Sequence, residues 1–206
     1  MNLIKRILNK SLVTTACLSI LLMGCAIAGS PVRSYVDERT AVSVTAQKHA
    51  MVFYHEDFQA GVNIYDFADL GAFEVNQSGK RHQYLCLILW STLARTPEHQ
   101  SRIEDAFVNL VVWADDQPIT FKRVTQNREM LLLGDEVFKR STASVREGYY
   151  AVTAAQLSTL AAAKQLKIEP ADQAQGETPY RPWRNERNSL AAFAEEISNT
   201  AKMMGQ

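Results

Sequence analysis

The chain has 206 residues, 47% of them hydrophobic, and its 22 Lys and Arg residues balance its 22 Asp and Glu residues. This balance excludes a net positive charge of the kind that attracts nucleic acid or binds anionic lipid strongly, so no nucleic-acid partner is expected. The length suffices for one domain with a hydrophobic core, and the chain contains no internal repeat or coiled-coil heptad pattern.

The first two dozen residues have the organisation of a signal peptide. Three cations, Lys5, Arg6 and Lys10, come before an uncharged segment that is rich in Leu, Val, Ile and Ala, residues 11–23. This segment is too short to span a bilayer comfortably, because spanning takes about 20 apolar residues. A positive segment followed by a short apolar one therefore predicts export from the cytoplasm.

The apolar segment ends in Leu22-Met23-Gly24-Cys25, which resembles the lipobox of bacterial lipoproteins. The resemblance implies cleavage after Gly24 and attachment of fatty-acyl chains such as palmitate to Cys25. One chain holds a protein only reversibly, so two or three chains are needed for stable attachment to a membrane. In a Gram-negative host, Ala26 implies the periplasmic face of the outer membrane. The alternatives are an ordinary secretory signal with an accidental cysteine and an uncleaved anchor.

Cleavage would change the charge and the cysteine content of the chain. Removing 24 of the 206 residues leaves 182, with 19 Lys and Arg against 22 Asp and Glu, a net charge of −3. Only Cys86 would remain as a free thiol, so no internal disulfide is expected. Its apolar neighbours, residues 84–90, predict a buried core thiol rather than a nucleophile. The expected organisation is a signal peptide at 1–24, a lipidated cysteine and tether at 25–33, and one periplasmic domain at 34–206.

The first part of the expected domain has a β pattern. Short segments at 41–45 and 51–54 are β-branched or compactly apolar, which predicts strands. Segments 73–75 and 84–90 flank a turn that contains Asn76 and Gly79, which predicts a hairpin. Its second strand is apolar on both faces and is therefore expected at the centre of a sheet.

Further pairs of strands and two helices follow. Segments 108–113 and 119–124 predict a second hairpin, and segments 130–133 and 136–139 predict a third one around Gly134-Asp135. Thr153 and Gln156 have the spacing of a capping box, which predicts a helix that runs to Lys164. Apolar residues at helical spacing predict a second helix over 189–203. Residues 165–169 suit a strand and residues 173–183 an irregular arm. The expected fold is α+β, mainly antiparallel β-sheet and sandwich-like, with two C-terminal helices.

Motifs for enzyme chemistry are missing from the sequence. It has no phosphate-binding glycine loop, nucleophile-elbow serine, paired-cysteine zinc pattern or His-Glu-x-x-His helix, and no cofactor is expected. Imidazole and carboxylate groups that could bind a divalent metal or share a proton occur at His55, Glu56, Asp57 and His82. Neighbouring residues of a strand point in different directions, however, so exposed polar groups explain this set equally well. Asp66 and Asp69 are expected to be loop carboxylates.

A second candidate site lies near the C-terminus, where three arginines surround a tryptophan: Arg181, Trp183, Arg184 and Arg187. Guanidinium groups pair with anions and the indole ring offers a broad contact, so this set could bind phosphate headgroups, polysaccharide or an acidic protein surface. The alternative is that Trp183 packs the arm onto the domain while the arginines are solvated or pair with nearby acids.

A lipobox followed by a β-rich domain of this size is similar to the accessory lipoproteins of secretion and envelope-assembly machines, including the type VI secretion lipoprotein. The resemblance covers only the lipobox and the general architecture. It implies an outer-membrane-anchored, non-catalytic binding or assembly subunit with a protein partner in the cell envelope. Two alternatives stay open: a periplasmic enzyme that uses the histidines and acids near His55, and a small-ligand or cell-wall binding protein that uses Trp183 and its arginines.

Overall fold

The structure is a computed structural model, and it describes residues 29–59, 62–93, 96–139, 146–171, 179–184 and 186–204. The predicted signal peptide, the lipobox-like motif and residues 173–178 of the expected arm lie outside the described residues. Contacts within the chain separate residues up to Ser30 from a compact unit that begins at Pro31. All elements named here belong to that second unit.

Antiparallel β-structure dominates the described residues, which confirms the expected α+β class. The strands are β1 (Val32–Val36), β2 (Ser43–Gln47), β3 (Met51–Gln59), β4 (Val62–Gln77), β5 (Lys80–Ser91), β6 (Asn109–Ala114), β7 (Gln117–Thr125), β8 (Arg146–Ala151), β9 (Leu166–Pro170) and β10 (Arg181–Arg184). The helices are α2 (Pro97–Ala106), α3 (Ala154–Ala162) and α4 (Arg187–Met204), with a 3-10 turn η1 (Arg128–Leu131). The two C-terminal helices, α3 and α4, were predicted, whereas α2 was missed.

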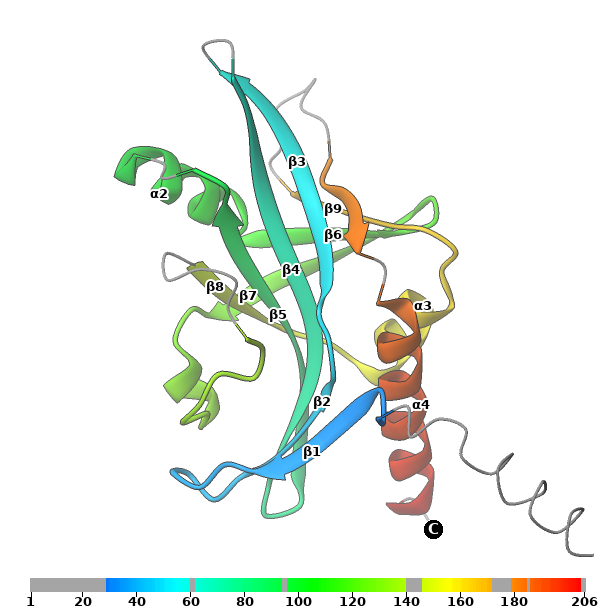
Figure 1. The fold of residues 1–206 in the computed structure, drawn as a ribbon. Helices are drawn as coiled ribbons and strands as arrows, with labels where there is room; N and C mark the ends of the chain where they lie inside the picture. Colours follow the sequence, from blue (N-terminus) through cyan, green and yellow to red (C-terminus); the bar gives the residue numbers. More distant parts are fainter. Residues whose placement is uncertain are drawn as a thin grey trace, which may run out of the picture. The chain divides into compact units, whose positions relative to one another are not determined.

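Strands β4 and β5 form the long hairpin at the middle of the fold (Figure 1). On its other side β5 pairs with β8, which confirms its central position. Strand β4 is long enough to take two partners on its free edge, β3 along its first half and β2 along its second half. The sheet continues from β8 through β7 and β6 to β9. The predicted hairpins β4–β5 and β6–β7 are therefore both present.

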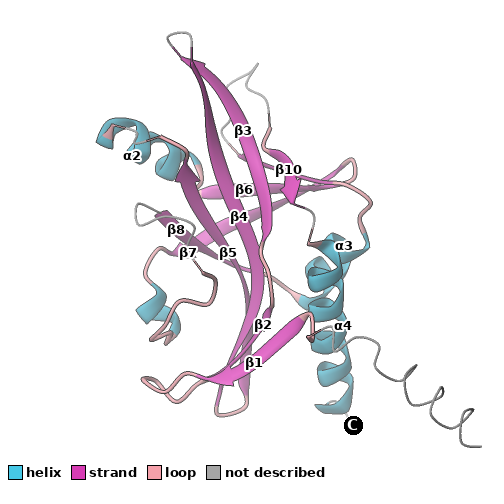
Figure 2. Ribbon diagram, viewed as in Figure 1, coloured by secondary structure: helices cyan, strands magenta, loops and turns pink. Residues whose placement is uncertain are grey.

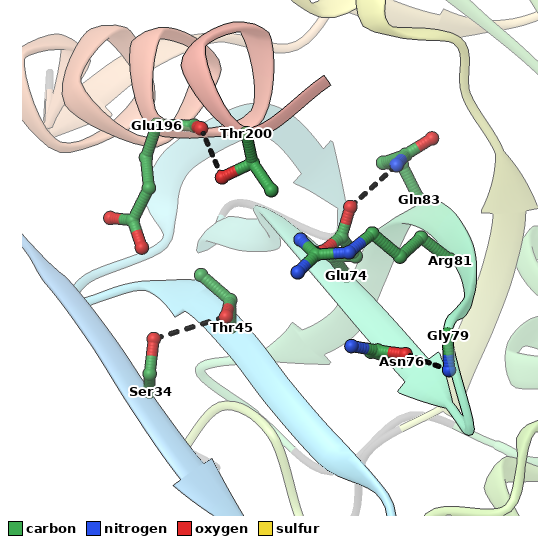
Figure 3. Close-up of polar contacts among 9 residues, drawn as sticks. All are labelled: Ser34, Thr45, Glu74, Asn76, Gly79, Arg81, Gln83, Glu196 and Thr200. Carbon is green, nitrogen blue, oxygen red and sulfur yellow. Dashed lines mark hydrogen bonds and ion pairs between the residues drawn. The ribbon is translucent and has the colours of Figure 1, made fainter. Parts of the chain in front are cut away.

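The β4–β5 turn shows why this hairpin is readable from sequence. Ser78 and Gly79 have φ values of 51° and 90°, the left-handed conformations that a two-residue hairpin turn needs. Asn76 before the turn accepts a hydrogen bond from the N–H of Gly79 through its Oδ1 atom, at 2.9 Å (Figure 3). A residue that accepts this bond and a glycine that tolerates positive φ together fix the register of the hairpin.

The two faces of β4 belong to two different cores, because side chains alternate along a strand. Ala68, Leu70 and Ala72 point to the first face, where residues of β6 and β9 and the apolar stripes of α3 and α4 cover them. Phe73 and Val75 point to the second face and pack with Cys86 and with the segment from Leu131 to Phe138. Cys86 is a buried core thiol, as predicted.

The third predicted hairpin is wrong. Residues 130–139 contain η1 and a loop, seen in Figure 2 as the mainly pink segment between β7 and β8, and no strand. Leu133, Val137 and Phe138 of this segment are buried against the second face of the sheet. The backbone N–H groups of Gly134 and Asp135 donate to the Asp37 carboxylate rather than to a neighbouring strand. The apolar residues that suggested strands therefore cover the sheet instead of extending it.

The sequence analysis missed β1 and β8, whereas the remaining elements agree with prediction apart from their ends. The capping box of Thr153 and Gln156 is formed at the start of α3, and the predicted strand at 165–169 is β9. The last part of the expected irregular arm is strand β10, which pairs with β3 through a bulge. Val32 and Arg33, expected in the tether, already pair with β2 as part of β1.

Candidate functional site

The histidines of the first candidate set lie far apart. His55 pairs with Asp66 of β4, whereas His82 pairs with Val75. Nine residues of extended strand separate Asp66 from Val75, a distance of roughly 30 Å. His55 packs against Tyr180 with ring centroids 5.3 Å apart and the ring planes tilted by 32°. Glu56 lies on the opposite face, where it accepts a hydrogen bond from the hydroxyl of Tyr65.

These positions leave no site shared by both histidines of the set. The side chain of Asp57 lies outside those that the structure describes. Among the described residues, no three His, Cys, Asp or Glu side chains are grouped so that they could hold a metal ion. His55 and His82 are therefore too far apart to bind one metal ion or one small substrate.

The expectation that Asp66 and Asp69 are loop carboxylates is wrong. Both lie within β4 and are only 5% and 6% exposed. Asp69 accepts a hydrogen bond from Nε1 of Trp90 on the neighbouring strand, at 3.0 Å. The sequence analysis missed the first half of β4 because two acids interrupt its apolar residues, and acids are uncommon in strands. In the fold both acids are buried and have interaction partners.

A further buried acid, Glu74, was missed by the sequence analysis. Its side chain accepts hydrogen bonds from Arg81 at 2.8 Å and Gln83 at 2.6 Å, both on β5 (Figure 3). A buried carboxylate is tolerated when a cation and further donors surround it. These contacts tie the end of the β4–β5 hairpin together and give Glu74 a structural role.

The four residues of the arginine and tryptophan set do not act as one group. Arg187, at the start of α4, donates hydrogen bonds to the backbone carbonyls of Ala163 and Lys164. It thereby satisfies carbonyl groups at the end of α3, a structural role that basic residues often take. Arg181, Trp183 and Arg184 lie on β10 and are exposed.

Trp183 belongs instead to a cluster of five aromatic rings, which we call the aromatic surface: Tyr54, Tyr65, Phe67, Trp90 and Trp183. The indole of Trp183 meets Tyr54 and Phe67 edge to face, with centroids 5.4 Å and 6.0 Å apart. Phe67 in turn stacks on Trp90 at 4.2 Å with an interplanar angle of 10°. Tyr65 adjoins both Tyr54 and Phe67. Trp183 remains 58% exposed despite these contacts.

The register of the sheet builds this cluster. Tyr54, Phe67 and Trp90 face one another across β3, β4 and β5 in one row. Tyr65 lies two residues before Phe67 and therefore on the same face. Trp183 sits at the bulge of β10, and a bulge redirects a side chain. The row lies on the second face of the sheet, on the half of β4 that is remote from Phe73 and Val75.

Of these five residues the sequence analysis found only Trp183. The other four come from three strands, so their proximity depends on pairing between distant segments. The local signal that was available is the pair Tyr65 and Phe67, which are separated by Asp66 and therefore mark one aromatic face of a strand.

Comparison with models of known protein families, with curated proteins and with solved structures gave no match. Within the described part of the chain, no helix is both long enough and apolar enough to cross a membrane.

Proposed function

We propose that this chain is a lipid-anchored, non-catalytic binding subunit of a bacterial cell-envelope complex, and that it contacts a protein partner through the aromatic surface. The lipobox-like motif at Leu22–Cys25 supports the anchor, and in a Gram-negative host the location is the periplasmic face of the outer membrane. The observation that supports the binding role most directly is Trp183, a large indole that is 58% exposed on an ordered row of rings.

An exposed tryptophan in such a setting suits a protein interface. Trp and Tyr are enriched at the centres of interfaces, where each ring offers a large contact area and few rotatable bonds. The edge-to-face contacts with Tyr54 and Phe67 restrict the indole before any partner arrives. Because the indole is already restricted, binding costs it little further conformational entropy, and more of the interaction free energy remains as affinity.

The test is the substitution Trp183→Ala in the tagged full-length chain, followed by cross-linking in intact cells and detergent extraction. Loss of an interface residue of this kind costs about 2 kcal/mol or more, which is roughly a 30-fold weaker Kd. The recovery of a dominant cross-linked protein should fall accordingly. Val124→Ala is the matched control, because Val124 is 49% exposed on β7, a strand that pairs with neither β3 nor β10.

The outcomes separate the possible partners. Full recovery of the cross-linked protein by Trp183→Ala would overturn the proposed interface. If no protein is captured but retention on purified peptidoglycan depends on Trp183, the surface binds glycan rather than protein, since sugar rings also stack on aromatic side chains. Cys25→Ser tests the anchor separately: it should yield a soluble or uncleaved chain, and unchanged extraction with the membrane would contradict lipidation.

A further inference from the structure

A pocket of about 540 Å³ opens between β3, β10 and the chain that leads into β9. Its apolar wall includes Met51 and Phe53 of β3 and Leu166 of β9. Met51 and Phe53 point to the first face of the sheet, whereas the aromatic surface lies on the second face. The volume falls in the range of pockets that bind small molecules, about 300–1,000 Å³. This pocket is therefore a separate feature from the aromatic surface.

The rest of the pocket wall is cationic. Lys164 and Lys167 belong to the segment at the start of β9 and Arg181 and Arg184 to β10, and no Asp or Glu is among the described residues that line the pocket. All four cations are exposed, and none forms an ion pair with a carboxylate of a described residue. Four positive charges at one pocket contrast with the net charge of −3 expected after removal of residues 1–24. The pocket should hence attract anions.

We infer that this pocket binds a small amphipathic anion, a molecule with a short apolar body and one phosphate or carboxylate head. The apolar body would lie against Pro179 and Pro182, over the nearly buried side chains of Met51, Phe53 and Leu166. The head would lie among the lysines and arginines, where guanidinium groups form paired hydrogen bonds with phosphate or carboxylate oxygens. The molecule could be a lipid fragment or a soluble metabolite, since both can carry this chemistry.

Calorimetric titration of the full-length protein in zwitterionic nanodiscs tests the inference. Three probes separate its parts: octyl phosphate has both the head and the apolar body, inorganic phosphate has only the head, and octanol has only the body. Titrations of empty nanodiscs correct for partition into lipid. Octyl phosphate should bind in a saturable way, and at least tenfold more tightly than either of the other two probes.

A charge-reversal pair provides the second arm. The double variant Arg181→Glu and Arg184→Glu should weaken octyl phosphate binding at least tenfold. The control is Lys80→Glu with Lys122→Glu, which makes the same change in net charge at two exposed lysines outside the pocket, and its affinity should equal that of the unsubstituted protein. Equal weakening by both pairs would show a nonspecific effect of net charge and overturn the site.

The unsubstituted protein alone can also refute the inference, even if the arginine variant fails to fold. If inorganic phosphate bound saturably and as tightly as octyl phosphate, the apolar residues would contribute nothing to binding. The ligand would then be a simple free anion. Octanol binding as tightly would eliminate the cationic part. No saturable binding of octyl phosphate would eliminate the site. None of these results depends on Trp183, so the proposed interface would stand or fall independently.

Discussion

Asp37 holds the segment from Leu131 to Phe138 against the second face of the sheet. It is 1% exposed and lies directly after β1. Its Oδ1 atom accepts hydrogen bonds from the N–H groups of Arg39 and Thr40 at 3.0 Å and 3.2 Å. Its Oδ2 atom accepts from Gly134 and Asp135 at 2.7 Å and 3.1 Å. One carboxylate thus joins the turn after β1 to the segment that covers the sheet.

Replacing this carboxylate with an amide should lower the stability of the fold. Asp37→Asn keeps the size but turns one accepting oxygen into an NH2 group, so two of the four backbone N–H groups lose their acceptor. Each buried donor without a partner costs about 1–3 kcal/mol, so for two donors we expect a loss of about 2–6 kcal/mol in the free energy of unfolding. That is a large part of the roughly 5–15 kcal/mol that stabilises a typical domain.

Urea unfolding followed by tryptophan fluorescence measures this loss. Glu38→Gln is the matched control, because it makes the same chemical change at the next residue, which is exposed. It should alter the free energy of unfolding by no more than about 0.5 kcal/mol. If Asp37→Asn proved as stable as Glu38→Gln, the four hydrogen bonds would not hold the covering segment in place.

The same carboxylate predicts a dependence on pH. Burial by itself raises the pKa of Asp37, but the hydrogen bonds from Asp135, Gly134, Arg39 and Thr40 together outweigh it and hold the pKa below the ordinary value of 3.8. In acid the unfolded chain therefore takes up this proton before the folded chain does. The stabilisation should be fully present above about pH 4 and should disappear as the pH falls through the folded-state pKa. Asp37→Asn should lack this component of acid sensitivity.

Two further substitutions test other parts of the fold. Gly71→Ala would place a Cβ atom closer to the ring of Phe138 than two carbon atoms can approach, so that ring must shift; we expect a loss of about 1–3 kcal/mol in urea unfolding, and an unchanged midpoint would show that Phe138 moves freely. Thr153→Ala removes a capping box in which the Thr153 hydroxyl accepts from the N–H of Gln156 at 3.2 Å, and it should cost about 1 kcal/mol, whereas Ser158→Ala on the exposed side of α3 should change stability by less.

Local signals made much of this fold predictable. The Asn76–Gly79 turn, the doubly apolar strand after it and the Thr153 capping box each depend on residues that are close in sequence. The segment around Gly134 was mispredicted because an apolar pattern is the same whether the residues pair in a sheet or pack on top of one. Asp37 decides between the two, and it lies 97 residues away from Gly134 in the chain.

The candidate site was less predictable than the fold, for the same reason. The aromatic surface needs the registers of β3 with β4 and of β4 with β5, and a shift of one residue would turn its rings to the opposite face. The pocket needs β10 beside β3, which no local pattern near Arg181 indicates. Arg187 was assigned to the same group only because it is near in sequence, and the fold instead uses it to end α3.

The second face of the sheet shows why the aromatic surface is suited to binding. The covering segment reaches β4 at Gly71, where the ring of Phe138 occupies the space that a side chain would fill. Two residues away, Asp69 binds Nε1 of Trp90 and so fixes the indole that stacks on Phe67. The uncovered half of this face is therefore held rigid by its own contacts. Rings that are already ordered lose little conformational entropy when a partner covers them. The exposed Trp183 can therefore contribute to binding at a low entropic cost.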